Sequence, residues 1–234
     1  MNQIYLALDF PTWKEAEHFL KEHDLQGVPV KVGMELFYRE GITVIERLKE
    51  DNHAIFLDLK LHDIPTTVMR TMRNLATLEV DFVNVHALGG SEMIKRAKEG
   101  LMSRCYDTKL LAVTILTSMD DEMINHDLHL SGTVDDNVLH LATMAEKSGA
   151  DGVVCSVHEA KRIKEKTNET FMTMTPGIRL SDSLDDDQKR VATPKKAREN
   201  KASSLVIGRS ITNAKDPKEA YKRALKEWND GITI

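Results

Sequence analysis

The feature of this chain that most restricts its fold is the alternation of short apolar runs with helical patterns along its whole length. Eight runs have the composition of strands, and segments with helical spacing separate them. The eight runs are Ile4–Asp9, Val28–Gly33, His53–Lys60, Asp81–His86, Lys109–Leu116, Asp151–Ser156, Phe171–Thr175 and Ser203–Gly208. Such alternation is typical of a parallel sheet with crossover helices. Eight units without a break in composition predict one α/β domain over residues 1–234, a (β/α)8 (TIM) barrel.

An open doubly wound sheet is the alternative fold. Its first strand is usually followed by a Gly-x-Gly-x-x-Gly turn, and no such turn is present here. Helix-end signals fit the eight-unit division. Thr12 and Glu15 predict a capping box, Asp216 and Pro217 predict a helix start, and Gly149 predicts a left-handed helix end.

The overall charge and the cysteines exclude several classes of protein. The chain has 32 basic and 37 acidic residues and a net charge of -5, so a nucleic-acid binder is not indicated. It has no apolar run of the ~20 residues that a membrane helix needs, and no secretory leader is evident. Cys105 and Cys155 do not form a disulfide framework, and we expect Cys155 in the core. We therefore expect a cytoplasmic protein.

Residues 54–65 carry a concentration of charge at the end of an apolar strand. Asp58 and Lys60 share one face of that strand, and Asp63 falls in the turn before Pro65. Apolar residues lie on both faces, Ala54 and Phe56 on the first and Ile55, Leu57 and Leu59 on the second. Burying charge there is costly. The cluster is either an ion pair that satisfies itself or a chemical site at a strand end.

Other predicted strands also end in polar side chains. Asp9 ends the first, Lys31 lies on the second, and His86, in line with Asn84, ends the fourth. In a barrel these residues converge on one mouth. We expect an alternating network of charge there, formed by Lys31, Asp58, Lys60 and Asp63.

This network restricts the chemistry of Lys60. A Schiff-base lysine needs a lowered pKa, whereas flanking carboxylates hold Lys60 as an ammonium group. A divalent metal could bind between Asp58 and Asp63, but Lys31 and Lys60 would compete for the same carboxylates. We therefore expect no metal. A charged lysine is suited to stabilising a developing carbanion and then protonating it.

A second group of residues follows the seventh and eighth strands. Gly208 ends the eighth run and Arg209 follows it, and Arg179 and Gln188 lie on the preceding loop. Loops at this position in a barrel often bind phosphate, through glycine amides and a planar arginine. The alternative is a glycine turn with a solvated arginine. The polar stretch 179–188 is either disordered or an active-site lid, and we favour the lid.

Several of these segments together resemble the orotidine 5'-phosphate decarboxylase family. The matching segments are Ala7–Asp9, Lys31–Gly33, Asp58–Pro65, Thr175–Arg179, Asp187–Pro194 and Val206–Arg209. The resemblance covers essentially the whole chain in order. It implies a lyase that converts orotidine 5'-phosphate to UMP and carbon dioxide, the last step of de novo pyrimidine biosynthesis, with no cofactor or metal.

The resemblance also implies roles for individual residues. Lys60 would protonate C6 of the pyrimidine, Asp58 would face the substrate carboxylate, and Lys31 and Asp63 would complete the charged array. Asp9 and Lys31 would hold ribose hydroxyls. The remaining substrate contacts would come from Thr117 (pyrimidine), Gln188, Gly208 and Arg209 (phosphate), and Pro176 and Arg179 (near the lid). Asp63, Ile64 and Thr67 would reach the neighbouring subunit's site, so a homodimer is expected.

Two other functions remain possible from the sequence. Magnesium-dependent decarboxylases and aldolases of keto-sugar phosphates resemble this chain, but they have an acidic residue where Lys31 stands, and a cation there would repel the metal. A non-catalytic barrel that binds a phosphorylated ligand is the other. It leaves the charged residues at the barrel mouth unexplained.

Overall fold

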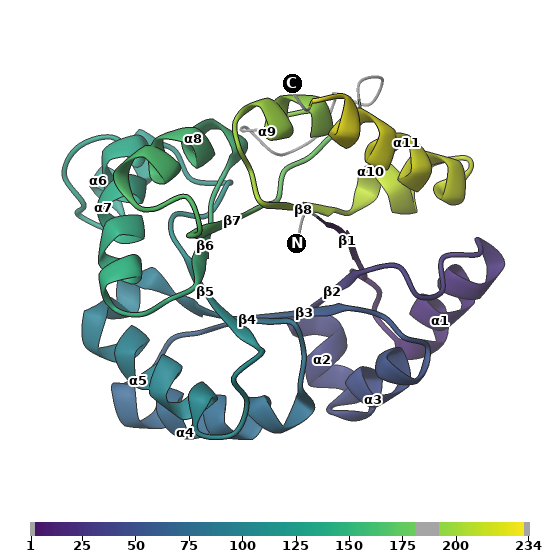
Figure 1. Cartoon of the computed structure of the whole chain (residues 1–234), viewed down its shortest axis with the longest axis horizontal. Coiled ribbons are helices and arrows are strands. Elements are labelled where there is room, and N and C mark those ends of the chain that lie inside the picture. Colours follow the sequence, from purple (N-terminus) through teal and green to yellow (C-terminus); the bar gives the residue numbers. More distant parts are fainter. Residues whose placement is uncertain (1–2, 181–191, 232–234) are drawn as a thin grey trace.

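The structure is a computed structural model that describes residues 3–180 and 192–231. Within these ranges, eight parallel strands pair in sequence order, and β8 closes on β1 to form a barrel (Figure 1). The predicted (β/α)8 barrel is confirmed. The strands are β1 (Ile4–Ala7), β2 (Val30–Gly33), β3 (Ile55–Leu61), β4 (Phe82–His86), β5 (Lys109–Val113), β6 (Gly152–Val154), β7 (Met172–Thr175) and β8 (Ser204–Ile207).

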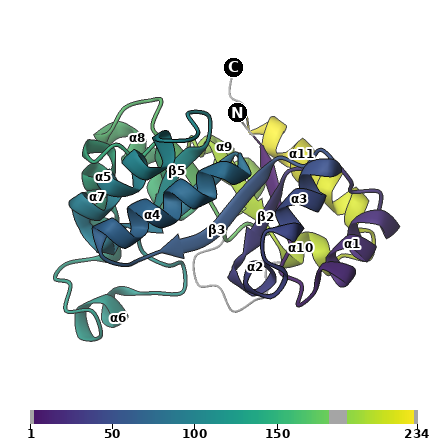
Figure 2. The ribbon, with the colours of Figure 1, turned by 90° about the horizontal axis from the view of Figure 1, so that it is seen from below.

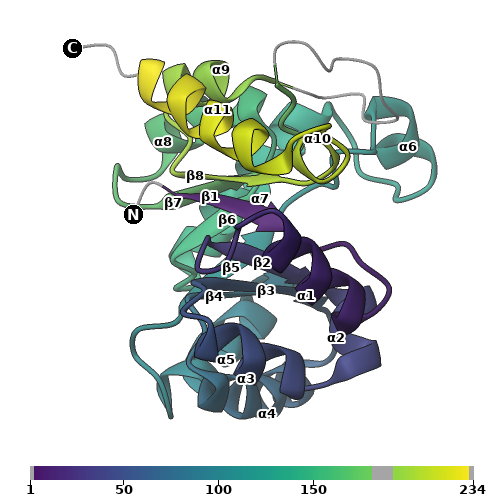
Figure 3. The ribbon, with the colours of Figure 1, turned by 90° about the vertical axis from the view of Figure 1, so that its right-hand side faces the viewer.

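Helices surround the strands (Figure 1). They are α1 (Trp13–Glu22), α2 (Met34–Glu40), α3 (Thr43–Glu50), α4 (Pro65–Leu75), α5 (Gly90–Met102), α6 (Asp121–His126), α7 (Val134–Lys147), α8 (Val157–Lys166), α9 (Pro194–Glu199), α10 (Arg209–Thr212) and α11 (Pro217–Asp230), with 3-10 turns η1 (Ala76–Leu78) and η2 (Ala87–Gly89). Two side views show α6 standing apart from this ring, beyond the end of the barrel toward which β3 points (Figures 2 and 3). None of the described helices is long and apolar enough to cross a membrane.

All eight strands are shorter than the sequence predicts. The first run was expected to reach Asp9, but β1 ends at Ala7, and the sixth was expected to reach Ser156, but β6 ends at Val154. The residues beyond these ends leave the ladder for the connecting loops at the barrel mouth. Asp9 therefore lies on the loop that follows β1, whereas Lys60 and His86 remain within β3 and β4.

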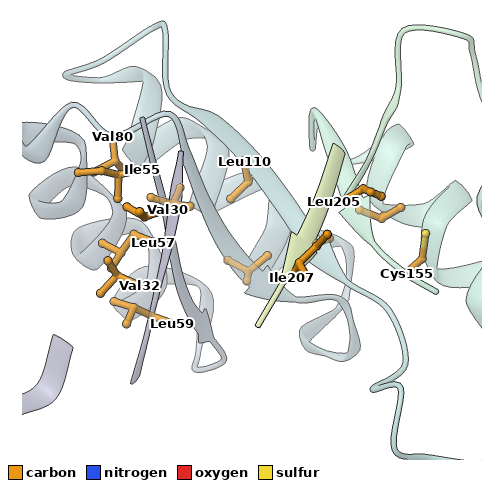
Figure 4. Packing of buried hydrophobic residues seen from close by; sticks show 14 of the residues in the cluster. Val30, Val32, Ile55, Leu57, Leu59, Val80, Leu110, Cys155, Leu205 and Ile207 are labelled. Carbon is orange, nitrogen blue, oxygen red and sulfur yellow. The ribbon is translucent and has the colours of Figure 1, made fainter. Parts of the chain in front are cut away.

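Alternating side chains of each strand form two cores. Inside the barrel, Tyr5 makes edge-on ring contacts with Phe56 and Phe82, at centroid distances of 6.4 and 5.8 Å. The outer core fills the space between strands and helices (Figure 4). Phe56 belongs to the inner cluster and Ile55, Leu57 and Leu59 to the outer, as the alternation along β3 predicts. Burying each large aliphatic side chain stabilises the fold by roughly 1.5–3 kcal/mol.

The predicted helix ends are confirmed with one correction. The Asp216 side chain accepts a hydrogen bond from the Glu219 amide at the start of α11, and Gly149 has a φ of 90° after α7. The Thr12 hydroxyl caps α1 by accepting from the Glu15 amide. The Glu15 carboxylate, however, accepts from the Thr12 hydroxyl and not from its amide, so the predicted reciprocal box is incomplete.

Candidate active site

A cavity of about 390 Å³ opens at the carboxyl ends of the strands. Side chains from the two ends of the chain meet there because the barrel closes β8 onto β1. The predicted site residues that line it are Asp9, Lys31, Asp58, Lys60, Thr117, Pro176, Arg179, Gly208 and Arg209. Apolar residues form another part of the wall, among them Phe56, Ile115, Val154 and Val206.

The first ion pair in the cavity joins Lys31 to Asp9. The Lys31 Nζ lies 2.6 Å from Asp9 Oδ1, with the lysine side chain 10% and the aspartate side chain 63% exposed. Ala7, two residues before Asp9, pairs with Lys31 across β1 and β2. A Cβ at Gly33 would lie 3.4 Å from the Lys31 Nζ, so this glycine gives the ammonium group room.

The second ion pair joins Lys60 to Asp58 on β3. The Lys60 Nζ lies 2.7 Å from Asp58 Oδ1, and both side chains are largely buried. The same oxygen accepts a hydrogen bond of 2.7 Å from Asn84 Nδ2. The Asn84 Oδ1 in turn accepts the Lys60 amide at 2.7 Å. The sequence placed Asn84 on the strand-end face but gave no sign of these contacts.

Two histidines stack beside this pair. The rings of His62 and His86 lie 5.7 Å apart with an angle of 19° between their planes. The pKa of His86 is lowered mainly by its burial, and to a smaller extent by the nearby His62 and Lys60. A neutral His86 adds no second cation next to Lys60, and its Nδ1 accepts the Leu88 amide at 3.4 Å.

The structure does not bring Asp63 into the cavity of its own chain. Its side chain is exposed, and its Oδ1 accepts the amide of Ile64 at 2.6 Å. Ile64, which is 68% exposed, and Thr67 are likewise absent from the cavity wall. Of the four residues expected in one alternating network, Lys31, Asp58 and Lys60 line the cavity and Asp63 does not.

The residues predicted to bind phosphate, Gly208, Arg209 and Arg179, line the same cavity. Gly208 precedes α10, which begins at Arg209, and a Cβ on Gly208 would lie 3.4 Å from that of Ala7. Arg179 is only 5% exposed, and its Nη1 donates to the Ile178 carbonyl at 3.0 Å. Gln188, and with it most of the predicted lid, lies outside the described residues.

The donor set of the cavity is poorly suited to a metal ion. Asp9 and Asp58 both accept hydrogen bonds from lysine ammonium groups, which would compete with a cation for the carboxylates. In the part of the chain that the structure describes, no group of three or more His, Cys, Asp or Glu side chains could hold a metal ion.

Comparisons with known proteins agree on one family. The family model described as "Orotidine 5'-phosphate decarboxylase / HUMPS family" matches residues 2–224. The orotidine 5'-phosphate decarboxylases of Bacillus cytotoxicus and Bacillus cereus are each 49% identical to the chain over 237 residues, covering 100% of the chain and 99% of the relative.

Two solved structures are similar over nearly the whole chain. Orotidine 5'-phosphate decarboxylase from Lactobacillus acidophilus has a TM-score of 0.88 and 44% identity, covering 98% of this chain and all of that one. A conserved protein of Geobacillus kaustophilus described as uncharacterised has a TM-score of 0.85 and 44% identity, covering 97% of this chain and all of that one.

Proposed function

The chain belongs to the orotidine 5'-phosphate decarboxylase family and decarboxylates orotidine 5'-phosphate in pyrimidine biosynthesis, and we propose that Lys60 supplies the proton of this reaction without a metal or cofactor. The observation that carries the proposal is the Lys60–Asp58 pair, 2.7 Å apart in the cavity wall. In this proposal Lys60 acts as an ammonium group that both stabilises negative charge and donates a proton.

The proposed reaction uses this ammonium group twice. The bond between C6 and the carboxylate breaks, carbon dioxide leaves, and the electron pair stays on C6. The positive charge of Lys60 stabilises that carbanion more than it stabilises the neutral pyrimidine ring of the substrate, which lowers the barrier. Lys60 then gives its proton to C6 to form UMP, and solvent reprotonates the amine.

Asp58 has two functions in this proposal. It holds the Lys60 ammonium group in place, and it faces the substrate carboxylate. When neutral carbon dioxide leaves, the negative charge of that carboxylate passes to C6, where Lys60 stabilises it. The apolar wall formed by residues such as Phe56 and Ile115 keeps water away from the reacting carbon.

The rest of the cavity binds the nucleotide in this proposal. Asp9 and Lys31 bond ribose hydroxyls, and Thr117 contacts the pyrimidine edge. The phosphate group is held by the Gly208 amide and Arg209, together with Gln188, and Pro176 and Arg179 border this end of the cavity.

We also propose that the enzyme is a cytoplasmic homodimer in which residues 1–234 form one catalytic domain. Exposed apolar side chains lie within three residues of the ends of three neighbouring strands: Met34 (45% exposed) after β2, Ile64 (68%) after β3 and Leu88 (36%) after β4. Exposed apolar side chains that gather into one patch mark interaction sites, and we propose that these three belong to the dimer interface. In the dimer, Asp63, Ile64 and Thr67 would complete the neighbouring subunit's site.

An assay in excess EDTA tests the proposal against the magnesium-dependent sugar-phosphate enzymes. We expect the purified protein to lower the ultraviolet absorbance of orotidine 5'-phosphate at an undiminished rate in EDTA, because a lysine and not a metal stabilises the carbanion. Lys60→Ala protein purified in the same way controls for a contaminating decarboxylase. Activity that appears only after magnesium is added would contradict the proposal, and binding of the nucleotide without turnover would favour a non-catalytic barrel.

A further inference from the structure

Asn84 is a buried amide that lies behind the Asp58–Lys60 pair. It is 1% exposed and is not part of the cavity wall. Its Oδ1 accepts the main-chain amide of Lys60, and its Nδ2 donates to Asp58 Oδ1, both at 2.7 Å. The Lys60 amide can only donate and an ionised carboxylate can only accept, so these two partners fix the orientation of the Asn84 side chain.

The backbone at this point departs from regular pairing. Leu57 pairs with Val83 and Leu61 with Val85, so three residues of β3 face one residue of β4. That one residue is Asn84. Lys60 has a φ of 51°, a left-handed conformation that residues with a Cβ adopt at a cost. The Asn84 side chain bonds the Lys60 amide in this irregular segment, where the regular ladder is interrupted.

The two contacts of Asn84 converge on the reacting group. Asp58 Oδ1 accepts from both Lys60 Nζ and Asn84 Nδ2 at 2.7 Å. The Asn84 side chain therefore positions two parts of the structure. It holds the main chain at Lys60, and it holds the Asp58 oxygen to which the Lys60 ammonium group is bonded. The lysine is held at both ends.

We propose that Asn84 is a positioning residue for the decarboxylation, which fixes the Lys60 ammonium group through its bonds to the Lys60 amide and to Asp58. This inference rests on the proposed role of Lys60. Asn84 has no contact with the substrate in this proposal, and it acts entirely through the other two residues. Its loss therefore changes turnover more than nucleotide binding.

The Asn84→Asp variant separates this role from a structural one. It keeps the size of the side chain and the acceptor for the Lys60 amide, but it replaces the Nδ2 donor. The introduced carboxyl group imitates the amide only when it is protonated, because then it donates to Asp58. When it is ionised, two carboxylates meet, and such a pair retains a shared proton to unusually high pH.

We expect the kcat of Asn84→Asp, divided by that of the wild type at the same pH, to fall as pH rises. A misplaced reacting group lowers the rate on the order of 100-fold. The kcat of the variant should therefore be ~100-fold below the wild-type kcat near pH ~8, and this difference should become at least ~10 times smaller near pH ~5.5. KM should change less than ~3-fold at either pH, since the nucleotide contacts remain.

Two further variants control for folding. Asn84→Leu removes both bonds, and its deficit in kcat should not recover at low pH. Thr108→Val removes the buried hydroxyl that donates to the Val80 carbonyl at 2.6 Å, before β5 and away from the cavity. It should lower the unfolding temperature of the protein while kcat stays unchanged. Should Asn84→Leu fail to fold, the pH profile of Asn84→Asp alone decides.

A kcat of Asn84→Asp close to the wild-type value, or a deficit that does not change with pH, would overturn the inference. Lys60→Ala measured in parallel distinguishes an error in the role of Asn84 from an error in the role of Lys60. If Lys60→Ala is inactive while the Asn84 variants turn over normally, only the role of Asn84 is wrong. If Lys60→Ala retains turnover, the proposed role of Lys60 is itself wrong.

Discussion

Lys60→Ala should lose on the order of 10⁴-fold or more in kcat, because one group supplies both charge stabilisation and the proton. The Kd for UMP should change less than ~10-fold, since the lysine acts mainly in the transition state. Single-turnover decarboxylation measures the first quantity, and calorimetric titration with UMP measures the second. Loss of binding and turnover in parallel would mean that Lys60 is mainly a binding residue.

The chain offers a matched control for this variant. Lys98 and Asp151 form an ion pair of 2.6 Å with similar exposure of the two side chains, 20% and 24%, outside the cavity wall. Lys98→Ala therefore removes a comparable ion pair with no link to the proposed chemistry. It should retain wild-type turnover. A large loss in Lys98→Ala would show that breaking any partly buried ion pair disables the enzyme.

Mixing inactive Lys60→Ala with inactive Asp63→Ala should restore activity if the sites are shared between subunits. In a heterodimer of these variants, one site combines an intact Lys60 with an intact Asp63 from the neighbour. Random exchange in a symmetric dimer makes half of the dimers mixed, so about one quarter of all sites should be active. The rate of decarboxylation after refolding the two proteins together measures this fraction.

The control mixture is Lys60→Ala with Asp58→Ala. Both of these residues line the cavity of the same chain, so each site of the heterodimer keeps one defect and no activity should return. Recovery in the Asp63 mixture alone identifies Asp63 as the residue contributed by the neighbour. If the Asp63 mixture stays inactive after confirmed exchange, the site is not shared.

The fold could be predicted from the sequence because its main signals are local. The alternation of Phe56 with Ile55 and Leu57 determines which side of β3 faces the inner core, and the structure confirms it. Asp58 and Lys60 both line the cavity, as the alternation predicts, although the pairing of β3 with β4 is irregular between Leu57 and Leu61. Eight such units leave few ways to bury both faces of every strand.

The partners of the charged residues could not be predicted, because they depend on pairing between strands. Lys31 bonds Asp9 because β1 and β2 align Ala7 with Lys31. This alignment is the register of the two strands, and the composition of the strands does not reveal it. The link from Asn84 to Asp58 depends on the irregular pairing of β3 with β4. Lys60 has a positive φ although no glycine marks the position.

Loop conformation limited the prediction in a different way. The sequence placed Asp63 in the turn after β3 and in the charged network, and the resemblance gave it a role at the neighbouring subunit's site. The structure shows the Asp63 carboxylate bonded to the adjacent Ile64 amide at the surface. It is not part of the cavity wall of its own chain. Its role depends on the neighbouring subunit, which the mixing experiment tests.

The most direct test of Lys60 as the proton donor is hydrogen exchange at C6 of UMP in deuterated water. A group that delivers a proton to C6 also removes it in the reverse direction, so the wild type should slowly replace the C6 hydrogen with deuterium. The loss of the C6 proton signal in a nuclear magnetic resonance spectrum measures this rate. We predict exchange with the wild type and Lys98→Ala and none above background with Lys60→Ala. Exchange at the wild-type rate in Lys60→Ala would contradict the account.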